Sequence, residues 1–275
     1  MVLIAFIKGV FKEALAKKIF LTIFGFFSLL IILSVFALTN STVEGMQMML
    51  ESSGANSLRE AVLTFQSYIV AGIPMFMLVS SMLIITSSFI PDMLKKGHID
   101  LLLSKPISRT KILIGHFIAA TLIVLIAFTF LMGAIWILVS VKTGFWNPAF
   151  LYSILWFTLI FSVLYSGVML IGVLSRSTIL SIIINMLLFF PLSFLLYLAN
   201  TYFQSDEKSI VFGPVAESLL KFFYQIFPKP WDMQDMTVSF VSQNAVANYM
   251  PLISSLLFMT IMLVLSIWYF NKKDY

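Results

Sequence analysis

Residues 112–141 read ILIGHFIAATLIVLIAFTFLMGAIWILVSV, a stretch of 30 residues without a single Asp, Glu, Lys or Arg. A helix needs about 20 apolar residues to cross the roughly 30 Å of hydrocarbon in a bilayer. This stretch is therefore long enough to cross a membrane once and too short to cross it twice. Bare backbone polar groups are not tolerated in lipid, and the stretch shows no strict alternation of apolar and polar residues, so we expect a helix rather than a barrel strand.

Five more uncharged stretches surround this one. They are residues 19–43, 61–91, 143–175, 177–205 and 236–271, with lengths of 25, 31, 33, 29 and 36 residues. The sequence therefore predicts an all-α polytopic membrane protein with six transmembrane helices. We place these helices near residues 19–39, 67–90, 112–140, 149–174, 178–199 and 251–270, within a transmembrane domain that covers residues 19–275.

The overall composition excludes several classes of protein. The 275 residues are 60% apolar and only 11% charged, whereas an ordinary soluble domain has about 25% charged residues. A soluble globular protein, a disordered chain and a nucleic-acid binder are thereby excluded. No cysteine is present, which excludes a disulfide framework and a thiolate metal site. We expect no metal or cofactor to be bound by this chain.

Lysine and arginine indicate the orientation in the membrane. With the N-terminus inside, the inner segments carry 12 Lys and Arg and the outer segments carry five. Basic residues are enriched in cytoplasmic loops. We therefore expect a multi-pass protein of the cell (inner or plasma) membrane with both termini in the cytoplasm.

Two segments outside the spans have amphipathic patterns. In residues 1–18, apolar side chains recur at helical spacing, which predicts a helix on the inner membrane surface. In the outer segment 200–250, Gly213-Pro214 suits a helix start and Pro228-Lys229-Pro230 a helix stop. The apolar face expected between them consists of Val215, Leu219, Phe222, Phe223 and Ile226. We expect this helix to lie along the outer interface.

The sequence lacks the charged residues within spans and the phosphate-binding loop that usually supply the energy for transport. The six expected spans contain no Asp, Glu, Lys or Arg, although proton- or sodium-coupled carriers usually need such groups or broken helices. No Gly-x-x-x-x-Gly-Lys-Ser/Thr phosphate loop is present. We expect that the chain is not an enzyme, and that active transport would need energy from another subunit.

Small and polar residues in spans two and five predict either intrachain packing or a dimer interface or pathway. The candidates are Ser80, Ser81, Asn185 and Ser193.

The inner loop 91–111 carries a recognisable motif. Residues 97–109 read GHIDLLLSKPISR. This resembles the membrane subunits of ABC-2-class ABC transporters, which have an acidic-x-x-x-Gly-Thr-acidic-x-Leu-Leu-x-x-Pro-x-Ser-Arg pattern between spans two and three. His98 stands where Thr is usual, and Asp92 stands for the upstream acid, out of register with the pattern. The six-span plan resembles most the subgroup that includes the copper-enzyme maturation permeases.

The resemblance implies a specific assembly. Residues 91–106 would form a coupling helix seated on a cytoplasmic ATP-binding subunit, and residues 1–18 an elbow helix beside it. Two copies of this permease and two ATPase subunits would form an exporter in the lipid bilayer, with ATP and Mg on the partner subunit. The residues implied in ATPase coupling are Asp92, Gly97, Asp100, Leu101, Leu102, Leu103, Pro106 and Arg109. The alternatives are a self-sufficient channel or secondary carrier, and a membrane scaffold that recruits a cytoplasmic protein. The cargo does not follow from the sequence.

Overall fold

The structure is a computed structural model that describes residues 9, 11–12, 19–40, 57–97, 99, 107–204, 213–246 and 248–273. All regular structure in these ranges is helical. Of the predicted elbow helix 1–18, only Gly9, Phe11 and Lys12 are described, and all three are helical. The rest of that prediction lies outside the described residues.

Six long helical stretches correspond to the six predicted spans. Five of them are long and apolar enough to cross a membrane, and the sixth contains a shorter apolar stretch, Leu21–Leu33, inside a helix of 22 residues. Their helices are α2 (Ile19–Asn40), α4 (Leu58–Val70) with α5 (Gly72–Thr86) and α6 (Phe89–Met93), α8 (Arg109–Thr143), η1 (Pro148–Leu151) with α9 (Tyr152–Ser175), α10 (Thr178–Leu187) with η2 (Leu188–Leu192) and α11 (Ser193–Gln204), and α14 (Met250–Lys272). The all-α polytopic fold is thus confirmed.

The second span differs from its prediction in length and shape. It begins at Leu58 rather than near residue 67, because Ser57 accepts a hydrogen bond from the Glu60 backbone N–H and caps α4. The chain then leaves helical geometry at Ala71, and Gly72 has a positive φ of 55°. Glycine adopts this conformation without a Cβ penalty, so the span is divided into α4 and α5.

The fifth span contains a local irregularity that its hydrophobicity did not reveal. Residues Leu188–Leu192 form a π-helix with Pro191 inside it. Proline has no backbone N–H and its ring clashes with the carbonyl four residues earlier. The wider turn accommodates this residue and lets α10 continue into α11.

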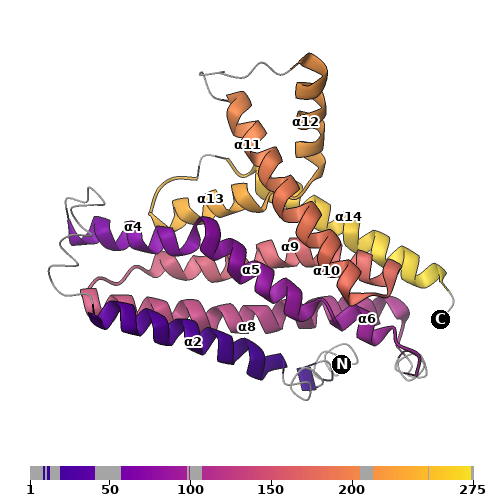
Figure 1. The fold of residues 1–275 in the computed structure, drawn as a ribbon, viewed down its shortest axis with the longest axis horizontal. Coiled ribbons are helices and arrows are strands. Elements are labelled where there is room, and N and C mark those ends of the chain that lie inside the picture. The colour runs from indigo at the N-terminus through magenta and orange to yellow at the C-terminus, as the bar shows by residue number, and fades with distance from the viewer. Residues whose placement is uncertain are drawn as a thin grey trace.

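Two helices lie between the fifth and sixth spans. The first, α12 (Pro214–Ile226), begins and ends where the prolines predicted. Its five predicted apolar side chains are all exposed, whereas Lys221 on another face pairs with Glu217 at 2.6 Å. The second, α13 (Pro230–Val241), was not predicted as a helix. In Figure 1, α11 and α12 project together from the side of the bundle, and α12 runs across the direction of α8 and α9.

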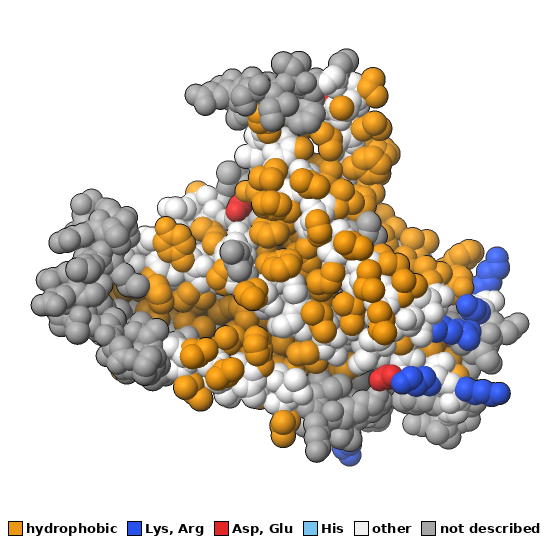
Figure 2. Space-filling model, in the orientation of Figure 1, with side chains coloured by type: hydrophobic (Ala, Val, Ile, Leu, Met, Phe, Trp, Pro, Cys, Tyr) orange, Lys and Arg blue, Asp and Glu red, His pale blue; other side chains and the backbone are white. Residues whose placement is uncertain are grey.

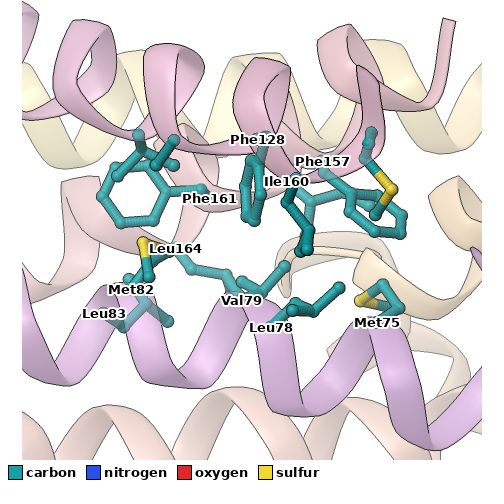
Figure 3. Close-up of a cluster of buried hydrophobic side chains, with 14 of the residues drawn as sticks. Met75, Leu78, Val79, Met82, Leu83, Phe128, Phe157, Ile160, Phe161 and Leu164 are labelled. Carbon is teal, nitrogen blue, oxygen red and sulfur yellow. The ribbon is translucent and has the colours of Figure 1, made fainter. Parts of the chain in front are cut away.

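Helix α9 is the centre of the bundle. It packs against α5, α8, α10, α13 and α14. Figure 3 shows the core between α5 and its neighbours, where Met75, Val79 and Met82 meet aromatic and aliphatic side chains of α8 and α9. Those side chains are Phe128, Phe157, Ile160, Phe161 and Leu164.

One end of the bundle collects the basic side chains. The starts of α2, α8 and α10 and the ends of α6, α9 and α14 lie together there (Figure 1), and Lys and Arg side chains gather at the same end in Figure 2. We refer to this end as the inner end, because the bias in Lys and Arg predicts that it faces the cytoplasm.

Candidate functional site

Helix α6 carries the first residues of the motif at the inner end. Its Asp92 forms an ion pair with Lys95, with 2.6 Å between Oδ1 and Nζ. The helix lies very close to α9, since a Cβ added to Gly172 would stand 3.3 Å from the Cβ and Cγ2 of Ile90. Ile90, Pro91 and Met93 are buried. The chain thus enters the inner loop from a helix that is packed firmly on the central span.

The middle of the motif falls mostly outside the described residues. Asp100, Leu101, Leu102, Leu103 and Pro106 lie in residues 100–106, which the structure does not describe. Gly97 is described, and its φ of 88° explains why glycine occupies this position. Ile99 is buried, and its backbone N–H donates to the Lys95 carbonyl at 3.1 Å.

Both flanks of the loop belong to one hydrophobic cluster. This inner cluster joins buried side chains from α6, α8, α9 and the last turn of α14 with Ile99. Its buried members are Ile90, Met93, Leu94, Ile99, Ile112, Leu113, Ala119, Met169, Val173 and Phe270. Burial of this apolar surface holds the loop's two ends at a fixed place on the bundle.

Arg109 closes the motif and points towards the last helix. It is the first residue of α8, after the N-cap Ser108. Its Nη1 donates to the carbonyl oxygen of Lys273 at 2.7 Å and approaches that of Phe270 at 3.5 Å. The guanidinium predicted to serve ATPase coupling therefore contacts the end of α14 directly.

The small and polar residues of spans two and five lie inside the chain. Ser80, Asn185 and Ser193 are buried and Ser81 is half-buried. The Asn185 amide donates to the Ser181 carbonyl at 2.7 Å. Within the part of the chain that the structure describes, the Ser80 hydroxyl and the Asn185 side-chain oxygen make no hydrogen bond. A role for these residues at a dimer interface or in a pathway stays a prediction.

The two helices that carry these residues are in contact. The rings of Phe76 on α5 and Phe190 on η2 meet edge to face, with centroids 4.4 Å apart. Spans two and five are therefore neighbours within one copy of the chain.

A buried polar cluster lies at the end of the bundle opposite the inner end, which we call the outer end. It was not predicted. The Asn147 side chain donates to Gln66 Oε1 at 2.7 Å and to the Val241 carbonyl at 3.0 Å, and it accepts from Gln243 at 3.1 Å. Trp136 donates its indole N–H to the Asn147 carbonyl at 2.8 Å. These bonds join α4, α8, the loop before η1, and α13. Only the turn signal of Asn147-Pro148 was visible in the sequence.

A second unpredicted cluster lies where α12 meets α13. The Tyr224 hydroxyl donates to Asp232 Oδ1 at 2.6 Å, and the Tyr197 hydroxyl donates to Asp235 Oδ2 at 2.8 Å. Burial raises the pKa of both aspartates and outweighs the opposing effect of these hydrogen bonds.

Lys229 completes this second cluster. Its ammonium donates to the Ser254 hydroxyl at 2.7 Å and lies 4.6 Å from the centre of the Tyr224 ring. Burial lowers the pKa of Lys229, and the nearby Asp232 opposes that shift. The cluster therefore links α11, α12, α13 and α14.

Neither cluster has the composition of a metal centre. Among the described residues, no three His, Cys, Asp or Glu side chains come together. The structure instead provides a packed helical bundle whose inner end carries the inner cluster, with buried residues from both flanks of the inner loop.

Comparison with known proteins identifies the family. The family model described as ABC-2 family transporter protein matches residues 11–275. The chain belongs to the ABC-2 transporter family. A search of curated proteins finds no match. The ABC-2 match covers all six helical stretches together with the inner loop, so this chain is a multi-pass membrane subunit of an ABC transporter rather than its catalytic subunit. Membership also implies association with an ATP-binding subunit.

Proposed function

We propose that this chain is the permease of an ATP-driven exporter and that a separate ATP-binding subunit acts on its inner loop 91–106. Two copies of the permease and two ATPase subunits form the transporter, and ATP and Mg bind to the ATPase subunits. The ABC-2 family match over residues 11–275 is the observation that carries this proposal.

The geometry of the inner end supports the coupling role of the loop. The inner cluster buries Ile90 and Met93 before the loop and Ile112 and Leu113 after it. A force on residues 98–106 would therefore act on the bundle through side chains that are already packed. Packed interfaces respond to such forces by rigid-body shifts between discrete arrangements rather than by continuous deformation.

Direct contacts connect the entry to the inner loop with the central helix α9. Helix α6 lies against α9 at Gly172, and α9 contacts α5 and α10. We propose that ATP binding draws the two ATPases together, moves the loops, and changes the packing between the α5 and α10 helices of the two permease copies. Ser80 and Asn185 would then lie beside the route of the cargo.

The test replaces the apolar residues of the loop. Leu102→Asp combined with Leu103→Asp should abolish co-purification of the ATPase subunit, because a buried apolar contact cannot accept two unpaired carboxylates. The matched control is Leu219→Asp on α12, which is exposed and projects from the side of the bundle away from the inner loop. The control should retain the ATPase, and both variants should still insert into the membrane.

The alternative outcomes have definite meanings. If the double variant retains the ATPase as well as the parent does, the loop is not the docking element and the proposal is wrong. If the ATPase binds to the parent but ATP changes no distance within the complex, the chain recruits a protein without being driven by it.

A further inference from the structure

Two helices of opposite direction meet at the inner end of the bundle. Helix α8 begins at Arg109 and α14 ends at Lys272. The Arg109 guanidinium donates to the carbonyl of Lys273 at 2.7 Å. Beside it, the Asn271 side-chain amide donates to the Thr110 hydroxyl at 3.2 Å. Two side-chain contacts thus join the first turn of α8 to the end of α14.

The charge of Arg109 is better placed for α14 than for its own helix. The N-terminus of a helix carries partial positive charge and the C-terminus partial negative charge. The first turn of α8 contains Arg109 and Lys111 and no acidic residue, which opposes the dipole of α8. The last carbonyls of α14 lack partners within the helix, and the guanidinium supplies a charged donor to them.

Packing reinforces this contact. Phe270, whose carbonyl lies 3.5 Å from Arg109 Nη1, is buried in the inner cluster with Ile112 and Leu113 of α8. The end of α14 is therefore held on α8 by apolar burial and oriented by the hydrogen bonds of Arg109 and Asn271.

We infer that Arg109 is a positioning residue that makes the inner ends of α8 and α14 move as one unit. Only Ile107 and Ser108 separate α8 from residues 98–106 of the inner loop, so a displacement of that loop must carry the first turn of α8. Through Arg109 the same displacement reaches the sixth span, which is far away in the sequence. The part of this inference that concerns ATP-driven displacement rests on the proposed function.

The first experiment tests the contact without nucleotide. The chain has no cysteine, so Thr110→Cys with Asn271→Cys introduces the only pair, to be joined by a short thiol-specific cross-linker in the purified permease. Arg109→Ala should lower the cross-linking rate roughly tenfold, since the hydrogen bonds from a charged donor that orient the end of α14 are lost. Arg109→Lys should give an intermediate rate, because an ammonium lacks the planar fork of guanidinium.

The matched control for this measurement is Lys111→Ala. Lys111 occupies the same first turn of α8 and its side chain is exposed. This variant should cross-link at the parent rate. Thermal unfolding of every variant shows whether the bundle is intact. Equal cross-linking in folded Arg109→Ala and in the parent would overturn the inference.

The second experiment tests movement in the complex with the ATPase. A spin label on Lys272→Cys reports the distance between the α14 ends of the two permease copies, and a label on Lys96→Cys in a separate sample reports the distance between the two loop entries. ATP should change both distances in the parent and in Arg109→Lys. In folded Arg109→Ala that retains the ATPase, the change between the α14 ends should fall several-fold while the change between the loop entries persists. A full response in Arg109→Ala would mean that α14 is moved by another route, and the inference would be wrong.

The two experiments separate the failure of the inference from that of the proposed function. If the parent complex shows no response to ATP at any labelled pair, the proposed function is wrong. The cross-linking rates, which are measured without nucleotide, would still decide whether Arg109 joins α8 to α14.

Discussion

At the scale of single residues, the side chain of Asn147 connects three positions that are distant in the sequence, Gln66, Val241 and Gln243. It is fully buried, and its side chain both donates and accepts hydrogen bonds. Arg59 extends the network by donating to Gln243 at 2.6 Å, and the hydroxyls of Ser67 and Ser242 share a hydrogen bond of 2.7 Å. A buried amide in this position favours the observed packing of α4 and α13 on the end of α8, because the loss of these hydrogen bonds would leave buried polar groups unsatisfied.

Asn147→Ala should therefore destabilise the protein. The substitution leaves the Gln66 side-chain oxygen and the Val241 carbonyl without the donor they now use. We expect a loss of about 2–4 kcal/mol, since each buried group left unsatisfied costs about 1–3 kcal/mol. The measurement is the free energy of unfolding in detergent micelles.

The control for Asn147 is an asparagine on the same side of the molecule. Asn244 is exposed, and Asn244→Ala should change the stability by no more than about 0.5 kcal/mol. Equal effects of the two substitutions would contradict the role assigned to Asn147.

At the scale of elements, the junction of α12 and α13 contains a set of polar contacts. The apolar face of α12 is exposed, with Phe222 at 57% and Val215 at 72% of their full exposure. The helix is bound to the rest of the protein by its packing beside α11, by the Tyr224–Asp232 hydrogen bond, and by the Lys229 contacts with α14. The second carboxylate oxygen of Asp232 is buried and forms no hydrogen bond with any residue that the structure describes. A junction of this kind should respond to pH.

Acidification should stabilise the junction through Asp232 and Asp235. Burial raises the pKa of both carboxyl groups in the folded state, so the folded state binds these protons more tightly than the unfolded state. The free energy of unfolding then rises as the pH falls through the folded-state pKa, and the gain is complete below the unfolded value of about 3.9. The lowered pKa of Lys229 acts in the other direction at alkaline pH, where stability rises as the pH rises.

Asp232→Asn tests this expectation. The amide removes the charge and keeps an oxygen that can accept from Tyr224, so stability at pH 7 should increase and the gain on acidification should shrink. Asp232→Ala is the control, because it removes both the charge and the acceptor and should stabilise less. Unfolding measured by hydrogen exchange of α12 and α13 between pH 7 and pH 4 gives the answer. A steeper pH dependence in Asp232→Asn would refute the explanation.

At the scale of the whole molecule, the distribution of charge predicts the orientation of an apolar helical bundle. The large exposed side chains of α2, α8, α10 and α14 are apolar along the middle of each helix, as lipid contact requires. Five lysines surround the inner end, namely Lys95, Lys96, Lys111, Lys272 and Lys273. The ammonium groups of Lys272 and Lys273 lie 5.1 and 5.0 Å from the rings of Trp268 and Tyr269, an arrangement that suits the membrane–water boundary.

The predicted orientation can be checked by labelling single cysteines. Lys96→Cys and Lys272→Cys should react with a membrane-impermeant thiol reagent only after cells are opened, because both lie at the inner end. Lys142→Cys and Ala245→Cys should react in intact cells. All four positions are exposed, so accessibility within the protein does not distinguish them. Reaction of Lys96→Cys in intact cells would reverse the topology and remove the basis for a cytoplasmic ATPase at the loop.

The sequence by itself determined that this protein crosses the membrane in helices and which residues they contain. Hydrophobicity and charge are local properties, and lipid leaves a backbone few alternatives to a helix. The helix start at Pro214 and the apolar face of α12 were equally local and were confirmed. The division of the second span at Ala71 and the identity of α13 as a helix required the structure.

Only the tertiary structure decided which polar side chains meet. Asn147 and Gln66 are 81 residues apart, and Arg109 and Lys273 are 164 residues apart. No spacing rule connects such positions, because their contact depends on how whole helices pack. The motif around the inner loop indicated that Arg109 matters, but the packing of α8 beside α14 determined that its guanidinium caps the end of the last span.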